Sequence, residues 1–372
     1  MKKIYTQPRT ETVATTPQQM LCASGIKAQI SGYKKNTGSS FSQPPYIWLA
    51  GIVCSSLLFL GTACSTTNNP DQPKQQSELK PRTLVVTQQA VSQVTPASAV
   101  RRLPQATITE NGDALDAIWS KGDEISFRNI SHKEYTDPKT HESVYLEGTL
   151  LADRAASIAS FASNDKVWCK LGDKILLVYP KATDPAITVS GSGSSLTASY
   201  SISLANQNGT LDKIASTHHH SYGIATITEV TPTVANAELA EMQNLLTVCK
   251  FSFVDENDQP LTITSLSISY GDGTYAGTYP EKATVVVSQE TNSTATVTPD
   301  KKSTDGGGYA LSISPSGTTE EVYVALLPES KATIYSFSLE SGENTYTGTA
   351  TARLNAGEFV VATNLKLTKV NP

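Results

Sequence analysis

The sequence predicts an all-β protein with two β-sandwich domains. Thr, Ser, Val and Tyr recur along the chain while Met is scarce, and β-branched and aromatic side chains fit a pleated sheet. Short apolar or alternating runs are separated by turn signals at close intervals, as in sandwiches. The clearest runs are 174–179, between Gly172-Asp173 and Pro180, and 261–270, which alternates as LTITSLSISY. These features together favour packed sheets over a helical or mixed fold.

The remaining strands are expected from the same two patterns, alternation and short apolar runs. They cover 83–87, 124–127, 200–204, 246–254, 322–327, 334–339 and 359–370. Only 236–246 (NAELAEMQNLL) is expected to form a helical turn or two, because it is rich in helix formers. We expect Trp119 to be a core aromatic, and Gly122 and Gly357 to permit tight turns before strands.

Length and charge limit the function classes. The chain has 372 residues, enough for two domains of ordinary size once an export segment is removed. Hydrophobic residues make up 38% and charged residues 17%, which fits neither a membrane bundle nor a strongly disordered chain. The formal net charge is -5 and no basic run stands out, so we expect no nucleic-acid partner.

An export segment precedes the predicted strands. Residues 46–64 (YIWLAGIVCSSLLFLGTAC) carry no charge, follow Lys34 and Lys35, and end in small residues before Cys64. This is the pattern of a secretory signal. The stretch is also about long enough to span a membrane, so an uncleaved anchor is the alternative. Residues 61–64 (GTAC) resemble the lipobox of bacterial lipoproteins, although Gly61 stands where Leu is usual. The resemblance implies lipid on the Cys64 thiol and cleavage before it.

We therefore divide the chain into four parts. Residues 1–63 form the export segment, in which 1–45 are an atypical extension. Residues 64–82 carry the lipidated cysteine and a polar, proline-containing tether. A composition break near 230–235 separates an N-terminal domain, 83–233, from a C-terminal domain, 234–372.

The cysteines of the two domains are Cys169 and Cys249. Pairing is possible in an oxidising envelope, but nothing in the spacing brings their Cα atoms together. We favour two separate thiols and leave the pairing open.

No segment carries a recognisable catalytic or cofactor pattern, so we expect no enzyme activity, no cofactor and no metal. Adjacent strand side chains point to opposite faces, so the run His218-His219-His220 is not expected to form a three-ligand metal site. With no Cys, Asp or Glu adjoining it, the run is interpreted as a solvated loop. The glycine-rich runs 191–195 and 306–308 are interpreted as loops. The acidic run 255–258 (DEND) lacks the twelve-residue calcium pattern and is expected to be a hairpin turn.

Five elements, in order, resemble those of the fimbrillins, the type V pilins and related lipoproteins of Bacteroidota. They are 117–125 (AIWSKGDEI), 173–180 (DKILLVYP), 202–212 (ISLANQNGTLD), 322–328 (VYVALLP) and 354–359 (LNAGEF). The resemblance covers roughly 83–370. It implies two sandwich domains of transthyretin-like topology, and a lipoprotein precursor carried to the cell outer membrane.

The resemblance also implies a route of assembly. In polymerising members, a protease cuts after an arginine, the first strand leaves, and a strand of the next subunit fills the groove. The arginines available here are Arg82, Arg101 and Arg102, with plain loop arginines as the alternative. Cleavage after Arg102 would remove 83–87, whereas cleavage after Arg82 would not. The chain ends soon after the last expected strand, which suits a tip, anchor or accessory subunit better than a shaft subunit.

The predicted function is that of a structural or adhesive fimbrial subunit at the cell surface. Its expected partners are other fimbrial subunits, the outer membrane through the lipid, and a host protein or glycan. The alternative is a glycan-binding surface lipoprotein of a polysaccharide-uptake system. That alternative predicts an exposed aromatic platform, for which the candidates are Trp168, Tyr270, Tyr275 and Tyr279.

Overall fold

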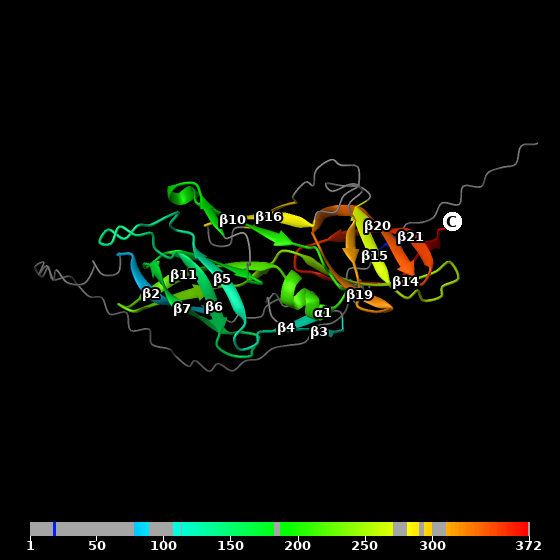
Figure 1. The fold of residues 1–372 in the computed structure, drawn as a ribbon, viewed down its shortest axis with the longest axis horizontal. Coiled ribbons are helices and arrows are strands. Elements are labelled where there is room, and N and C mark those ends of the chain that lie inside the picture. The colour runs from blue at the N-terminus through cyan, green and yellow to red at the C-terminus, as the bar shows by residue number, and fades with distance from the viewer. Residues whose placement is uncertain are drawn as a thin grey trace, which may run out of the picture. The chain divides into compact units, whose positions relative to one another are not determined.

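The computed structural model describes residues 18–19, 78–88, 107–112, 114–181, 187–270, 281–289, 294–299 and 310–370. All described residues lie in one compact unit of the chain. The fold is all-β, which confirms the predicted class (Figure 1). None of the helices in the described ranges has the length and apolar character needed to cross a membrane.

The described strands, with their bounds, are as follows. They are β1 (Gln18–Gln19), β2 (Lys80–Gln88), β3 (Thr107–Asn111), β4 (Ala114–Ile118), β5 (Glu124–Asn129), β6 (Glu147–Ala152), β7 (Ser160–Cys169), β8 (Lys174–Tyr179), β9 (Thr188–Ser190), β10 (Thr197–Ser203), β11 (Ser221–Val230), β12 (Val234–Leu239), β13 (Gln243–Asn244), β14 (Thr247–Val254), β15 (Ser265–Tyr270), β16 (Lys282–Ser288), β17 (Thr296–Pro299), β18 (Leu311–Ile313), β19 (Glu321–Leu326), β20 (Glu329–Ser341), β21 (Asn344–Leu354), β22 (Phe359–Lys366) and β23 (Thr368–Lys369). The helical turns are η1 (Gly193–Ser195), α1 (Leu211–Lys213) and the π-helical η2 (Ile214–His218).

The first large sheet closes on itself. Its strand order is β12-β2-β7-β6-β5-β8-β11-β13, and β12 also pairs with β11, so every strand except β13 belongs to a hydrogen-bonded ring. We call this the closed sheet. Its inward positions alternate along each strand, as period-two side-chain geometry requires, and they form one buried core. The closure matters because it leaves β2 with a hydrogen-bonded neighbour on each side.

Trp119 lies in the core of the closed sheet, as predicted. It is fully buried, and its ring meets those of Phe161 and Tyr179 edge-on at 4.9 and 5.4 Å. The backbone of Trp119 pairs with that of Ala156, which fixes the ring at the entry to β5. Gly122 has a φ of +88°, so the tight turn before β5 uses the conformational freedom of glycine as expected.

Two further sheets face each other over a second core. The three-stranded sheet β19-β14-β22 packs against the sheet β18-β15-β20-β21, to which β1 and β23 are added at β21. Phe251 and Phe253 of β14 approach Phe337 of β20 with ring centroids 5.3 and 5.5 Å apart. This arrangement is a sandwich, with aromatic contacts between its layers.

A four-stranded sheet, β17-β16-β10-β9, joins sequence segments on either side of residue 233, because β10 pairs antiparallel with β16. The segment after β10 also bonds to residues beyond 233, through the side chain of Gln207. The buried Gln207 amide donates to the carbonyls of Leu204 and Ala325, and its Oε1 accepts from the Ala325 amide. In the other direction, β12 follows residue 233 and pairs with β2. The predicted domain boundary at 233 stays a prediction.

The hairpin β3–β4 packs on the outer face of the three-stranded sheet (Figure 1). Its Ile108 and Leu115 pack with Val248 and Phe359 in a small separate core. At the edge of this core the Lys250 Nζ lies 3.1 Å from the Glu110 carboxylate and 3.0 Å from that of Glu321. The hairpin is therefore held both by apolar packing and by ion pairs.

The expected helix at 236–246 is wrong. The chain forms β12 and β13 there, and the buried side of β12 is Ala235, Ala237 and Leu239. Parallel pairing with β2 outweighs the helix propensity of this stretch, which is a weak preference of a few tenths of a kcal/mol per residue. The strand expected at 261–270 is shorter, because it begins only at Ser265.

Two smaller expectations are confirmed. Cys169 and Cys249 are separate buried thiols, one in each of two different cores. The acidic run at 255–258 is a hairpin turn, in which the Asp255 carboxylate accepts from the backbone amides of Asn257 and Gln259.

Candidate assembly site at strand β2

Strand β2 lies between two partners in the closed sheet. It runs antiparallel to β7 and parallel to β12, with Val85 opposite Ala162 on one side and Asn236 on the other. A bulge between Thr83 and Val85 shifts its register against β7, and the Ser163 hydroxyl accepts from the Leu84 amide there at 2.9 Å. The backbone of β2 therefore completes the hydrogen bonding of two neighbouring strands.

The inward side chains of β2 fill the closed sheet. Leu84 and Val86 are completely buried in its core, while Gln88 lies at one end and Arg82 towards the other, both buried. Burying one Leu or Val side chain is worth roughly 1.5–3 kcal/mol. Removal of β2 would therefore leave an open apolar channel and two unpaired strand edges, which are the features that recruit a replacement strand.

Arg82 is held by backbone carbonyls. Its Nε donates to the Thr231 carbonyl at 2.8 Å, and its Nη1 donates to the carbonyls of Lys80 and Cys169. Burial raises the pKa of the neighbouring Cys169 thiol to about 11, although the Arg82 charge acts in the opposite direction. The peptide bond after Arg82 thus lies within a strand that is paired on both sides, where a protease needs the strand to leave before it can cut.

The other predicted site residues fall elsewhere. Cys64, Arg101 and Arg102 lie outside the described residues, so their structure is not described. The two arginines belong to the segment 89–106 that joins the end of β2 to the start of β3. A cut after Arg102 would separate β2 from the chain and leave the β3–β4 hairpin attached to it.

The last strands have partners within the described fold. β22 runs parallel to β14, and β23 pairs with β21 through Thr368 and Lys369. Leu365 and Leu367 are buried in the sandwich core. The strand expected at 359–370 therefore forms two described strands, each of which pairs with a strand of the sandwich.

The aromatic residues suggested for a glycan platform separate into three groups. Tyr270 is completely buried, and its hydroxyl donates to the Leu327 carbonyl at 2.9 Å, so its assignment to an exposed platform is wrong. Tyr275 and Tyr279 lie outside the described residues. Trp168 is half-buried on β7, with its ring 5.5 Å from that of Tyr135.

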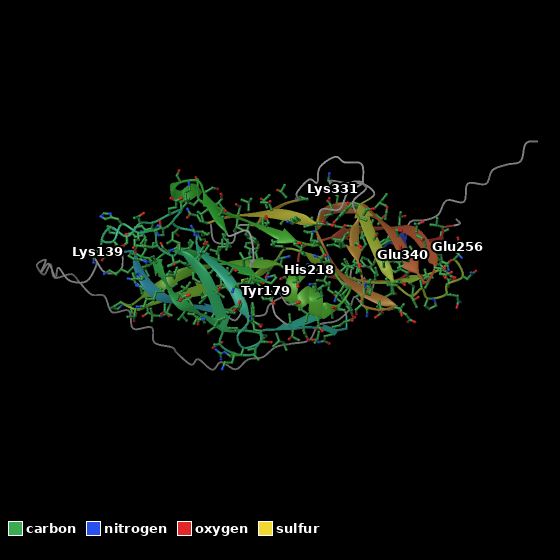
Figure 2. The ribbon with its side chains drawn as sticks, viewed as in Figure 1. Lys139, Tyr179, His218, Glu256, Lys331 and Glu340 are labelled. Atoms are coloured by element: carbon green, nitrogen blue, oxygen red, sulfur yellow. The ribbon has the colours of Figure 1, made fainter. Side chains whose placement is uncertain are left out.

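The histidine run does not form the solvated loop that the sequence suggested. His218, His219 and His220 are 0, 6 and 9% exposed, at the junction of η2 and β11 (Figure 2 labels His218 and Tyr179). His218 Nδ1 and His220 Nε2 both lie 3.1 Å from the Ser203 carbonyl oxygen, and the Tyr179 hydroxyl holds η2 through the Ala215 carbonyl.

Burial governs the charge of these histidines. It lowers the pKa of His219 and of His220 to about 4 and lowers the pKa of His218 as well, since an imidazolium loses its hydration there. The three residues are therefore neutral packing groups at pH 7. In the described ranges, no group of three or more His, Cys, Asp or Glu side chains is placed to hold a metal ion.

Comparison with known proteins gives likenesses of structure only. The chain matches no protein-family model and no curated protein. A candidate cell adhesion protein from Bacteroides ovatus is 13% identical, with a TM-score of 0.42 over 79% of this chain and 97% of its own. One from Bacteroides uniformis is also 13% identical, with a TM-score of 0.42 over 80% and 98%. The shaft pilin SpaA of Lactobacillus rhamnosus GG is 8% identical, with a TM-score of 0.28 over 79% and 99%. At these identities the likenesses assign no function to the chain.

Proposed function

We propose that this chain is a fimbrillin-like subunit of a cell-surface fibre, acting in adhesion and assembling by strand replacement at β2. The observation that supports this most is the position of β2. It is an inner strand with a partner on each side, it fills the core with Leu84 and Val86, and it is joined to the next strand by a segment that contains Arg101-Arg102.

The proposed maturation has two steps. The chain is first lipidated at Cys64 and carried to the outer membrane, and a protease then cuts after Arg102. The burial of Arg82 in a doubly paired strand favours the Arg101-Arg102 segment as the place of the cut. Loss of β2 opens β7 and β12, and an incoming strand with apolar residues at the Leu84 and Val86 positions restores the core.

The proposed position in the fibre is that of a tip, anchor or accessory subunit. β22 and β23 already pair with β14 and β21, so their donation to a neighbour would cost the subunit its own sandwich contacts. A subunit of this kind accepts a strand more readily than it gives one. Its partners are then other subunits and the outer membrane, and its place is the cell surface.

Locking β2 into the sheet is expected to stop assembly. In the variant Val85→Cys/Ala162→Cys, the two cysteines occupy directly opposed positions of β2 and β7. Opposed Cα atoms in an antiparallel pair are about 4.5–5.5 Å apart, which suits a disulfide. We expect the oxidised variant to reach the surface but to be absent from fibres, and reduction to restore its entry. Gel ladders of surface extracts, with and without reductant, measure this.

A matched control is the pair Ser126→Cys/Thr149→Cys, at opposed positions of β5 and β6. It adds the same disulfide to the same sheet without holding β2, and we expect it to assemble as the unmodified chain does. Fibres that incorporate the oxidised β2–β7 variant at the normal level would contradict assembly by strand replacement.

A further inference from the structure

An aromatic row crosses the outer face of the closed sheet beside the start of β2. Pro81 of β2 is directly opposite Trp168 of β7. On the other side of β7, the Trp168 amide donates to the Tyr145 carbonyl at 3.0 Å. This bond continues the register of β6 and β7, in which Leu150 is opposite Ser163. Opposed residues of an antiparallel pair point to one face, so these three side chains are neighbours. The Tyr135 ring contacts the Trp168 ring, so the aromatic row consists of Trp168, Tyr145 and Tyr135, with Pro81 beside it.

The row is held in place and accessible. Residues 131–146 form a hairpin in which Thr136 pairs with Ser143 and the Val144 amide donates to the Tyr135 carbonyl. Lys139 lies near its tip, as labelled in Figure 2. Tyr145 is 78% exposed, the most exposed of the large apolar side chains in the described residues. An exposed apolar ring of this kind marks a site of interaction, because a ligand that covers it removes apolar surface from water.

A polar row runs parallel to the aromatic row on the same face. Arg128 of β5 is opposite Glu147 of β6, with an ion pair of 3.0 Å, and Lys166 of β7 is opposite Thr83 of β2. Lys166 and Glu147 are exposed. The polar row therefore lies two residues along the strands from the aromatic row, on the same face of the sheet. It places two cations, a carboxylate and a hydroxyl beside the flat apolar surface of the rings.

We propose that these two rows form a binding surface for a neutral glycan chain. A sugar ring has an apolar C–H face, which stacks on an aromatic ring, and hydroxyls at its rim, which bond to both carboxylates and cations. The mixed signs of the polar row disfavour a strongly charged polymer. The rings lie on an open sheet face, which fits a chain of sugar rings better than a proline-rich helix that requires a groove.

This inference deepens the adhesive role proposed above by naming the class of ligand. It does not depend on strand replacement, because Trp168, Tyr145 and Tyr135 are present whether or not β2 stays. The locked variant Val85→Cys/Ala162→Cys is therefore expected to bind glycan as the unmodified chain does. Normal glycan binding by a chain that fails to assemble would support the glycan surface alone. Normal assembly of a chain that binds no glycan would support strand replacement alone.

The test is native affinity electrophoresis of the full chain in mild detergent, in gels that contain mannan, dextran, xyloglucan or galactomannan. We expect at least one of these neutral polysaccharides to retard the chain. Tyr145→Ala is expected to weaken that binding about tenfold, because it removes the most exposed ring of the row. Tyr145→Phe keeps the ring and is expected to bind within about twofold of the unmodified chain.

The matched control is Ile334→Ala, which removes an apolar side chain of 38% exposure from β20, away from both rows. It should leave the retardation unchanged, and circular dichroism should show all three variants folded. The proposal is overturned if none of the four polysaccharides retards the chain, or if Tyr145→Ala binds as the unmodified chain does. Retardation by poly-L-proline alone would overturn it in favour of a peptide ligand.

Discussion

Lowering the pH from 7 to 4 is expected to reduce the free energy of unfolding steeply, because three buried histidines must stay neutral in the folded protein. The pKa of His219 and of His220 falls from the usual 6.5 to about 4 on burial, and that of His218 falls as well. Between pH 6.5 and 4 the unfolded chain binds protons at these positions and the folded chain does not, so acid favours unfolding.

The expected size is large. A pKa lowered from 6.5 to about 4 corresponds to roughly 3 kcal/mol for each of His219 and His220, compared with a typical total stability of about 5–15 kcal/mol. This stability is fully present above pH 6.5 and is lost as the pH falls towards 4. Neighbouring positive charge adds to the effect of burial, since Lys213 lowers the pKa of His218, and His218 and His219 lower that of His220.

Urea unfolding at a series of pH values measures this effect. With His219→Leu, unfolding should take up about one proton fewer between pH 4 and 6.5. The free energy of unfolding should therefore change less steeply with pH, by roughly 1.4 kcal/mol per pH unit. The control is His141→Asn, because His141 is exposed and has a positive φ that Asn tolerates. Equal slopes in the two variants, or a stability that is flat from pH 6.5 to 4, would show that the buried histidines do not control acid stability.

Trp119→Ala is expected to have the second largest effect. The ring is fully buried between Phe161 and Tyr179 in the core of the closed sheet, and its removal leaves a cavity that the surrounding strands cannot fill. Substitutions of this kind cost about 3–5 kcal/mol. The same core holds Leu84 and Val86 of β2, so the variant should also hold β2 less firmly.

Denaturant unfolding at pH 7 checks the prediction for Trp119. Trp119→Phe keeps most of the ring contacts and removes an indole N–H that has no hydrogen-bond partner among the described residues, so a smaller loss of about 1–2 kcal/mol is expected. Tyr145→Ala serves as the surface control and should lie within about 0.5 kcal/mol of the unmodified chain. A loss of less than about 1 kcal/mol for Trp119→Ala would place the ring outside the core.

Strand positions could be predicted from the sequence where local pattern and turn signals agree. The run 174–179 has the bounds of β8, because an apolar stretch between a Gly-Asp turn and a proline leaves few alternatives. The pattern at 236–246 failed for a physical reason. Alternation of Ala235, Ala237 and Leu239 is weak as a strand signal, and the partner that selects it, β2, lies far away in sequence.

The candidate sites depended on pairing that no single-strand pattern contains. Nothing local shows that β12 pairs with both β2 and β11, which is what makes β2 an inner strand. Tyr145 and Trp168 become neighbours only through the register of β6 and β7. The histidine run was expected in a solvated loop because it is polar and has no adjoining ligand residues, but the packing of η2 against Tyr179 and the Ser203 carbonyl buries it.

Assembly by strand replacement requires β2 to leave the subunit when the fibre forms. The most direct measurement is the N-terminal sequence and intact mass of the chain recovered from surface fibres, compared with the unassembled chain from the same membranes. We predict that the assembled chain begins at Leu103 and lacks β2, while the unassembled chain begins at a lipidated Cys64. An assembled chain that still begins at Cys64 and retains Lys80–Gln88 would show that β2 is not replaced in the fibre.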